Sequence, residues 1–244
     1  MPLVATRGAA SAQGFGEFAV AATPTYIEDV FSTYLYTGNG STQTITNGID
    51  LSTEGGLVWI RIRTLASDHQ LFDTARGATK RLFSNLTDAE LTTAGTLNSF
   101  DTTGFSLGTQ SSVNFNTYPY VSWTFRKQPK FFDVVTYTGN SVAGREIAHN
   151  LGSVPGCMIV KSTSDAQDWA VYHRSLGNTK RLVLNGTDAE ITSTVWNNTT
   201  PTSTVFTVSD NARVNSNGST YVAYIYAHDA GGFGLTGKIG RAHV

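Results

Sequence analysis

The chain has 244 residues, a formal net charge of -1 and only 14% charged residues. A chain of this length can form one large domain or two of about 100–150 residues, each able to bury its own core, and we expect two. The sparse, balanced charge offers no broad basic surface to hold nucleic acid. No window approaches the roughly 20 apolar residues of a membrane span. We therefore expect neither a nucleic-acid partner nor membrane insertion.

Residues 1–30 differ in character from the rest of the chain. They are rich in Ala, Gly, Ser and Thr and contain few large apolar side chains. Such a segment buries too little surface to fold alone, so we expect an attachment segment, poorly ordered by itself, that orders against another protein. Residues 1–8 lack the apolar run of a signal peptide, which predicts synthesis in the cytoplasm.

An internal repeat organises the remainder. The sequence TKRL occurs at residues 79–82 and again at 179–182, and TDAE occurs at 87–90 and again at 187–190, both at a spacing of 100. Further along, residues 120–125 correspond to 221–226 with one extra residue. Repetition at a fixed period indicates duplicated structural units. We predict two homologous units, at residues 31–128 and 129–229, packed closely across a short linker.

Each unit has the pattern of short β-strands. Runs rich in Val, Ile, Thr, Tyr and Phe alternate with turn signals, including Asn-Gly pairs at 39–40, 47–48, 185–186 and 217–218. In residues 120–125, Val121, Trp123 and Phe125 would face one side and Ser122 and Thr124 the other, the half-buried pattern of a sandwich strand. The sequence therefore predicts an all-β fold: two tandem β-sandwich, jelly-roll-like units after an extended N-terminal segment, with two separate apolar interiors.

Several segments carry a family resemblance. They are YTGNGS at 36–41, LVWIR at 57–61, LFDTARGATK at 71–80 and YVSWTFRK at 120–127 in the first copy, and FFDVVTYTG at 131–139, HNLGSVPG at 149–156 and WAVYHRSL at 169–176 in the second. They resemble a repeat domain of tail-associated proteins of marine bacteriophages, cyanophages especially, over about residues 1–237. The resemblance implies a structural protein of the virion tail, a tail fibre or adhesin made in the host bacterial cytoplasm, and it implies this setting more firmly than any chemistry. From the motifs weighed below, we expect no enzymatic activity. It also implies other tail proteins as partners, a homotrimeric assembly and a role in host attachment.

The C-terminal residues need separate interpretations. Residues 232–237 fit G-x-G-x-x-G, but no helical pattern and no acidic residue about 20 positions later accompany the motif. We therefore interpret residues 230–237 as a Gly-rich linker. Residues 238–244, KIGRAHV, are what AAG-ATC-GGA-AGA-GCA-CAC-GTC encodes, which is similar to a sequencing adapter read in frame. We interpret them as an artefact and expect the natural chain to continue beyond Gly237.

Catalytic and metal sites are not predicted. The carboxylates of the two TDAE segments could suggest a glycosidase, but one catalytic centre rarely occurs intact in both halves of a repeat, so we expect hairpin positions. His173, Arg174 and Asp168 lack a nucleophile elbow and are expected at the surface. The histidines and the single Cys157 show no metal-ligand spacing, and Cys157 lies in an apolar run typical of a buried thiol. No cofactor is expected.

Three aromatic residues form the candidate ligand-binding site. Trp169 occupies the position of His69 in the first copy, so we expect its indole to be partly exposed. With Tyr172 and Trp196 it could stack on sugar rings, which makes a carbohydrate-binding module for host surface glycan the alternative function. The competing interpretation is that these rings pack against the neighbouring unit. A depolymerase is a third hypothesis, but it requires long parallel β-helix repeats that the sequence does not show.

Overall fold

The computed structural model describes residues 25–228, and this part of the chain is almost entirely β-structure. Its helical elements are three single turns: η1 (Ile27–Asp29), α2 (Ser111–Asn114) and α3 (Ala212–Asn215). The predicted all-β fold is confirmed. Most of the predicted attachment segment, the linker at 230–237 and the adapter-like residues 238–244 lie outside the described residues.

The first half of the chain forms two antiparallel sheets. One has the strand order β1-β9-β3-β4-β5-β6 and the other the order β2-β8-β7. The strands are β1 (Phe31–Thr37), β2 (Gln43–Thr46), β3 (Gly56–Ile62), β4 (Gln70–Asp73), β5 (Lys80–Phe83), β6 (Leu91–Thr92), β7 (Leu97–Asp101), β8 (Gly104–Leu107) and β9 (Pro119–Arg126).

The second half repeats this arrangement. Its large sheet has the order β10-β17-β12-β13-β14-β15, and β11 pairs with β16 in a smaller sheet. The strands are β10 (Phe132–Thr138), β11 (Arg145–Ala148), β12 (Pro155–Ser162), β13 (Ala170–His173), β14 (Lys180–Val183), β15 (Ile191–Thr192), β16 (Val205–Val208) and β17 (Thr220–Ala227). Each strand of the large sheet of one half therefore has a counterpart in the other.

Each half encloses its own apolar interior between a large and a small sheet. Tyr36 and Tyr120 stack in the first interior with ring centroids 5.1 Å apart, and Tyr137 and Tyr221 stack in the second at 5.1 Å. The hydroxyl of Tyr36 donates to a main-chain carbonyl oxygen, that of Val113, and the hydroxyl of Tyr137 donates to the equivalent carbonyl in the second half. The duplication thus extends from strand order to side-chain packing.

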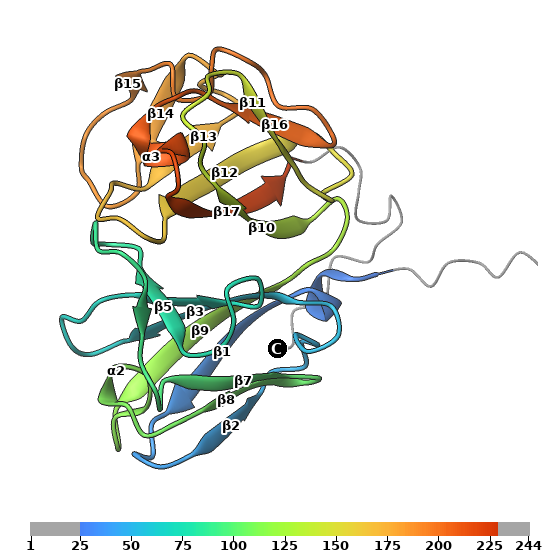
Figure 1. Ribbon diagram of the computed structural model, residues 1–244. Helices are drawn as coiled ribbons and strands as arrows, with labels where there is room; N and C mark the ends of the chain where they lie inside the picture. The colour runs from blue at the N-terminus through green and yellow to red at the C-terminus, as the bar shows by residue number, and fades with distance from the viewer. Residues whose placement is uncertain (1–24, 229–244) are drawn as a thin grey trace, which may run out of the picture.

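The two large sheets face each other, so the molecule is a stack of four sheets (Figure 1). Between them lies a third apolar cluster, which we call the junction. It includes Leu57, Leu71 and Leu82 from the first half and Phe132, Ile159, Trp169 and Tyr224 from the second. The sequence predicted two separate interiors. The structure adds a third that both halves share.

Strand β9 is half-buried as expected, but its hydroxyl-bearing face is the more deeply buried one. Ser122 and Thr124 are fully buried, whereas Trp123 and Phe125 are only partly buried. The Thr124 hydroxyl accepts a hydrogen bond of 2.8 Å from Asn47 Nδ2, so its burial leaves no unmet partner. The aromatic face turns towards the junction because a second sheet covers it there.

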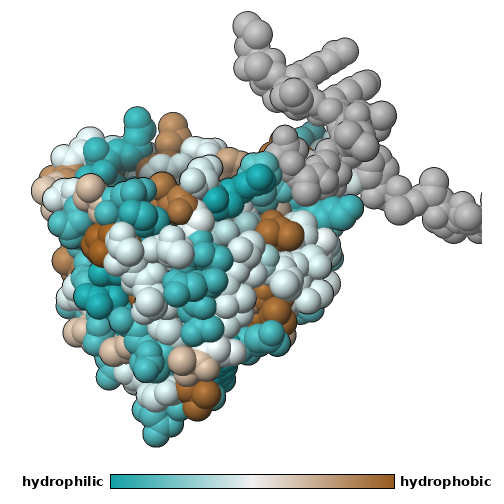
Figure 2. Space-filling view, turned by 90° about the horizontal axis from the view of Figure 1, so that it is seen from above, coloured by the Kyte–Doolittle hydropathy of each residue, from teal (hydrophilic) through white to brown (hydrophobic). Residues whose placement is uncertain are grey.

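The turn signals are largely realised, because Gly40, Gly48 and Gly218 have positive φ angles of 66°, 85° and 78°. Gly186 lies outside that region, so its Asn-Gly pair forms a different turn. Seen from above, the surface is mainly polar, with hydrophobic residues scattered singly (Figure 2). Among the described helices, none has the length and hydropathy to cross a membrane.

Candidate functional site

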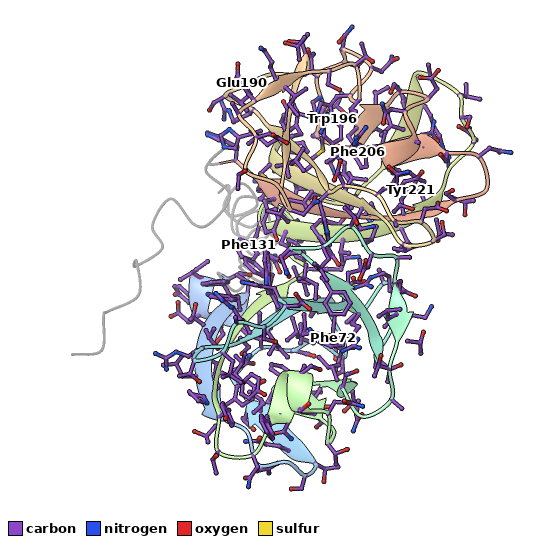
Figure 3. All side chains as sticks on the ribbon, turned by 90° about the vertical axis from the view of Figure 1, so that its left-hand side faces the viewer. Phe72, Phe131, Glu190, Trp196, Phe206 and Tyr221 are labelled. Carbon is purple, nitrogen blue, oxygen red and sulfur yellow. The ribbon has the colours of Figure 1, made fainter. Side chains whose placement is uncertain are left out.

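The three aromatic residues predicted to bind ligand are buried. Trp169 and Trp196 are 0% exposed and Tyr172 is 3% exposed. The Trp169 indole N–H donates to the carbonyl oxygens of Phe83 and Leu86, both at 3.0 Å. Trp196 lies inside the second half (Figure 3) and packs edge-on against Tyr172, with ring centroids 5.9 Å apart. The expected exposure is wrong, because Trp169 packs into the junction and the other two belong to the second interior.

The comparison of Trp169 with His69 misled because equivalent positions have different surroundings. His69 is partly exposed and its Nδ1 accepts a hydrogen bond of 2.9 Å from the Trp59 indole. Trp169 instead lies against the β5 end of the other half. A duplication makes sequences equivalent, but the contact between two copies need not use the same edge of each.

A charged cluster lies in the junction. Asp73 is fully buried and the Arg76 side chain is 3% exposed. Arg76 Nε donates to Asp73 Oδ2 at 2.5 Å, and the hydroxyl of Tyr224, from the second half, donates to the same oxygen at 2.8 Å. Arg76 Nη1 donates to Glu90 Oε2 at 3.1 Å. His173 is exposed, as expected, but its counterpart Asp73 in the first half is buried and bonds to Tyr224 of the other half.

Electrostatics favour the charged form of this cluster. Burial alone would lower the pKa of Arg76, but the Asp73 carboxylate and the Tyr224 hydroxyl outweigh burial and raise it above its ordinary value. Burial raises the pKa of Tyr224 well above 10. Arg76 is therefore a fixed cation with a carboxylate on either side.

The two halves are also joined through their main chains. The Glu90 N–H donates to the carbonyl oxygen of Thr163 at 2.8 Å, and the Gln167 N–H donates to that of Thr87 at 2.9 Å. Glu90 also pairs with Lys80, with 3.5 Å between Lys80 Nζ and Glu90 Oε1. The segment that was expected to be a solvated hairpin is thus part of the junction in the first copy.

A cavity of about 330 Å³ opens beside this cluster. Residues of both halves line it: Ala75, Arg76, Lys80 and Glu90 from the first, and Thr136, Tyr137, Thr138, Thr163, Thr220 and Tyr221 from the second. Ala75 also lines a neighbouring cavity of about 450 Å³. The first half alone forms this second cavity, whose lining includes Glu54, Phe100 and Lys127. Arg76 and Glu90 therefore belong both to the ionic cluster and to the wall of the cavity between the halves.

A family model described as "Domain of unknown function (DUF7483)" matches residues 27–239. The chain belongs to this family. No curated protein and no solved structure matches the chain. The DUF7483 match spans both halves, so the family's domain contains the junction as well as the two sandwiches.

The acid–base cluster that was considered at residues 168–174 is not assembled in the DUF7483 domain. Asp168 pairs with Arg213 at 3.1 Å and accepts from Asn185 Nδ2 at 3.1 Å. His173 and Arg174 are exposed, as expected, and the His173 ring accepts only a hydrogen bond from the Ser175 main chain. These contacts are those of a surface loop.

Cysteine and metal chemistry find no support in the described part of the DUF7483 domain. Burial raises the pKa of Cys157 to about 11, so its thiol stays protonated near neutral pH. Between residues 25 and 228, no three His, Cys, Asp or Glu side chains are arranged to hold a metal ion.

One further buried cation of the DUF7483 domain was missed. Lys161, the counterpart of Arg61, is fully buried, and its Nζ donates to the carbonyl oxygens of Ser162 at 2.7 Å and Asp165 at 3.1 Å. Burial lowers its pKa to about 8. No difference in charge marks Lys161, because both copies have a cation at this position. The buried ionic cluster did have such a signal, since Asp73 corresponds to His173 and Arg76 corresponds to Leu176 in an otherwise matched register.

Proposed function

We propose that the chain is a non-catalytic structural component of a bacteriophage virion, a tail-fibre or adhesin-like protein that contributes to particle assembly and host attachment. The observation that carries this proposal is the junction, where an apolar cluster and a buried ionic cluster join two sandwiches into one four-sheet block. Such a block suits a rigid spacer, because large side chains pack against one another between its halves and the charges of Asp73, Arg76 and Glu90 are paired there.

The phage setting is supported by the resemblance of the repeat segments. Those segments fall largely on the framework: 57–61 lies within β3, 120–126 within β9 and 132–138 within β10. On this proposal the protein is made in the host bacterial cytoplasm and resides in the virion tail, with other tail proteins as its partners.

The edge strand β1 supports contact with a neighbouring subunit, and we propose that the assembly is a homotrimer. β1 pairs only with β9, contains no charged residue and no proline, and exposes Tyr34 (37%) and Leu35 (57%). Because Val30 and Gly38 hydrogen-bond to the β9 side, the alternating residues between them, such as Leu35, direct their main-chain groups outward. Natural sheets usually protect such an edge with charges, proline or a covering element. A neighbouring subunit would provide that cover.

Immuno-electron microscopy tests the virion role. Antibodies raised against the purified chain should label the tails of particles of the phage that carries this gene. Labelling confined to lysate debris, with particles that lack the protein by mass spectrometry, would exclude the proposal.

The alternative, a carbohydrate-binding module, gains nothing from Trp169, Tyr172 and Trp196, because these rings are buried. Within residues 25–228, a sugar site requires polar groups that remain available at the surface. The cavity at the junction is such a place.

A further inference from the structure

The junction cavity contains polar groups that the contact between the halves does not use. Arg76 has five N–H groups, of which four donate to Asp73, Glu90, Leu71 and Tyr224. The second N–H of Nη1 remains, on a residue that lines the cavity. Lys80 Nζ makes one long contact, 3.5 Å to Glu90, and its side chain is 45% exposed. Both residues line the cavity from the first half.

The opposite wall is made of hydroxyl groups. Thr136, Thr138, Thr163 and Thr220 line the cavity from β10, from the residue after β12 and from the start of β17. The hydroxyls of Thr163 and Thr220 lie 2.6 Å apart and bond to each other. Those of Thr136 and Thr138 have no bond to another described residue. Each hydroxyl can donate one hydrogen bond and accept others.

The charges around the cavity cancel. Arg76 and Lys80 carry two positive charges, and Asp73 and Glu90 carry two negative charges close to them. An anionic ligand would therefore gain little net attraction and would approach Glu90 as well as Lys80. An apolar ligand would leave the hydroxyl and ammonium groups without partners. The arrangement suits a neutral molecule with many hydroxyl groups, each of which can accept from a cation and donate to a carboxylate.

We propose that this cavity binds a neutral carbohydrate of one or two sugar rings. Glu90 accepts from the ligand's hydroxyl groups, Lys80 and Arg76 donate to its oxygens, and the threonine wall does both. A volume of about 330 Å³ lies at the lower end of the range of small-molecule sites. This proposal rests on the junction geometry and does not depend on the virion role.

The duplication provides matched variants for the test. In the first half, Lys80→Met removes a proposed donor. Its control is Lys180→Met: Lys180 is the counterpart of Lys80, its Nζ lies 3.1 Å from Glu190 Oε1, and neither residue lines the cavity. In the second half, Thr138→Val removes a hydroxyl group while keeping the shape of the side chain. Its control is Thr37→Val, at the equivalent exposed position of β1. All four side chains are at least partly exposed, so the variants should fold.

The experiment is isothermal titration calorimetry on the full chain with glucose, galactose, N-acetylglucosamine, lactose and maltose at millimolar concentrations. N-acetylneuraminic acid and inorganic phosphate serve as anionic probes. We expect at least one neutral sugar to bind, with affinity reduced about tenfold in Lys80→Met and in Thr138→Val, since each loses one hydrogen bond. Lys180→Met and Thr37→Val should bind as the unmodified chain does.

Three results would overturn the proposal. They are the absence of binding by every neutral sugar, binding of the anionic probes alone, and an equal loss in the cavity variants and their controls. None of these results bears on tail labelling, so failure here and failure of the virion role can be told apart.

Discussion

Single charged residues decide how the two halves meet. Arg76 lies in a junction whose other side chains are mainly apolar, and the carboxylates of Asp73 and Glu90 balance its charge. A buried ion pair adds little stability compared with an apolar replacement of the same shape, but removing one partner is costly because the other charge stays buried. The cluster therefore specifies which faces come together more than it stabilises them.

Replacing Arg76 by Leu, the residue at its counterpart Leu176, should destabilise the protein by about 3 kcal/mol. The change leaves the buried Asp73 without its cation. Urea unfolding followed by tryptophan fluorescence measures the loss. Arg174→Leu, at an exposed position, serves as the control and should stay within about 0.5 kcal/mol of the unmodified chain. Equal stability of the two variants would show that the cluster is not buried as described.

Lys161 should make stability depend on pH. Its pKa in the folded protein is about 8, below the ordinary value of about 10.4 in the unfolded chain. Between these values the unfolded chain holds an extra proton on Lys161, which makes the free energy of unfolding rise with pH. Cys157 acts in the opposite sense above about pH 8.5, because burial raises its pKa in the folded protein to about 11. The experiment therefore uses a Cys157→Ala background, in which the free energy of unfolding should rise as the pH rises from about 8 towards 10. Below about pH 8 the buried charge costs on the order of 3 kcal/mol.

Unfolding midpoints at a series of pH values test this, with Lys161→Met expected to lose the rise and Lys180→Met, at a partly exposed site, expected to keep it. The series should stop near pH 10, because burial raises the pKa values of Tyr137 and Tyr224 and their ionisation in the unfolded chain then lowers stability. A rise that persists in Lys161→Met would assign the effect to another group.

What the sequence could predict at this scale was residue type rather than surroundings. The exposure of His173 and the apolar setting of Cys157 follow from local composition. The burial of Trp169 does not, because it depends on which edge of the other half lies opposite. No property of the residues next to Trp169 along the chain contains that information.

At the level of strands, the repeat was the most informative pattern. A spacing of 100 aligned β5 with β14 and β6 with β15, and both pairs occupy the same places in their sheets. Strand existence follows from β-branched and aromatic residues between turns. The more buried face of β9 could not be predicted, because the second half partly covers the face that would otherwise lie in solvent. Both faces of the strand are therefore at least partly buried, and alternation alone does not tell them apart.

The exposed edge of β1 leads to a prediction about assembly. Leu35→Lys should lower the oligomeric mass in solution, because a charge at the centre of an edge strand opposes pairing with another chain. Light scattering coupled to size-exclusion chromatography measures this mass. Val142→Lys is the control, since Val142 is also 57% exposed but lies outside the strands. A trimer that survives Leu35→Lys would place the subunit contact on another surface.

For the whole molecule, the shared junction predicts one cooperative unfolding transition. Phe132 is 1% exposed and its ring lies 5.6 Å from that of Phe125 and 5.0 Å from that of Tyr226. Phe132→Ala should cost about 3–5 kcal/mol and separate the melting of the two halves.

Differential scanning calorimetry would show the single peak of the unmodified chain dividing in this variant. Phe115→Ala, at a position 43% exposed in the first half, should keep one peak. Two peaks in the unmodified chain would mean that the halves unfold independently despite their contact.

The positions of the two ends of the described chain bear on how a pulling force would act. The Val30 carbonyl oxygen accepts from the Arg126 N–H, and the Ala227 N–H donates to the Phe131 carbonyl oxygen. Both ends therefore meet at the five-residue bridge that joins the halves, at one corner of the stack. A force applied between these two ends would therefore act mainly on this corner. Most of both sandwiches would lie to one side of the line of force and would not be stretched by it.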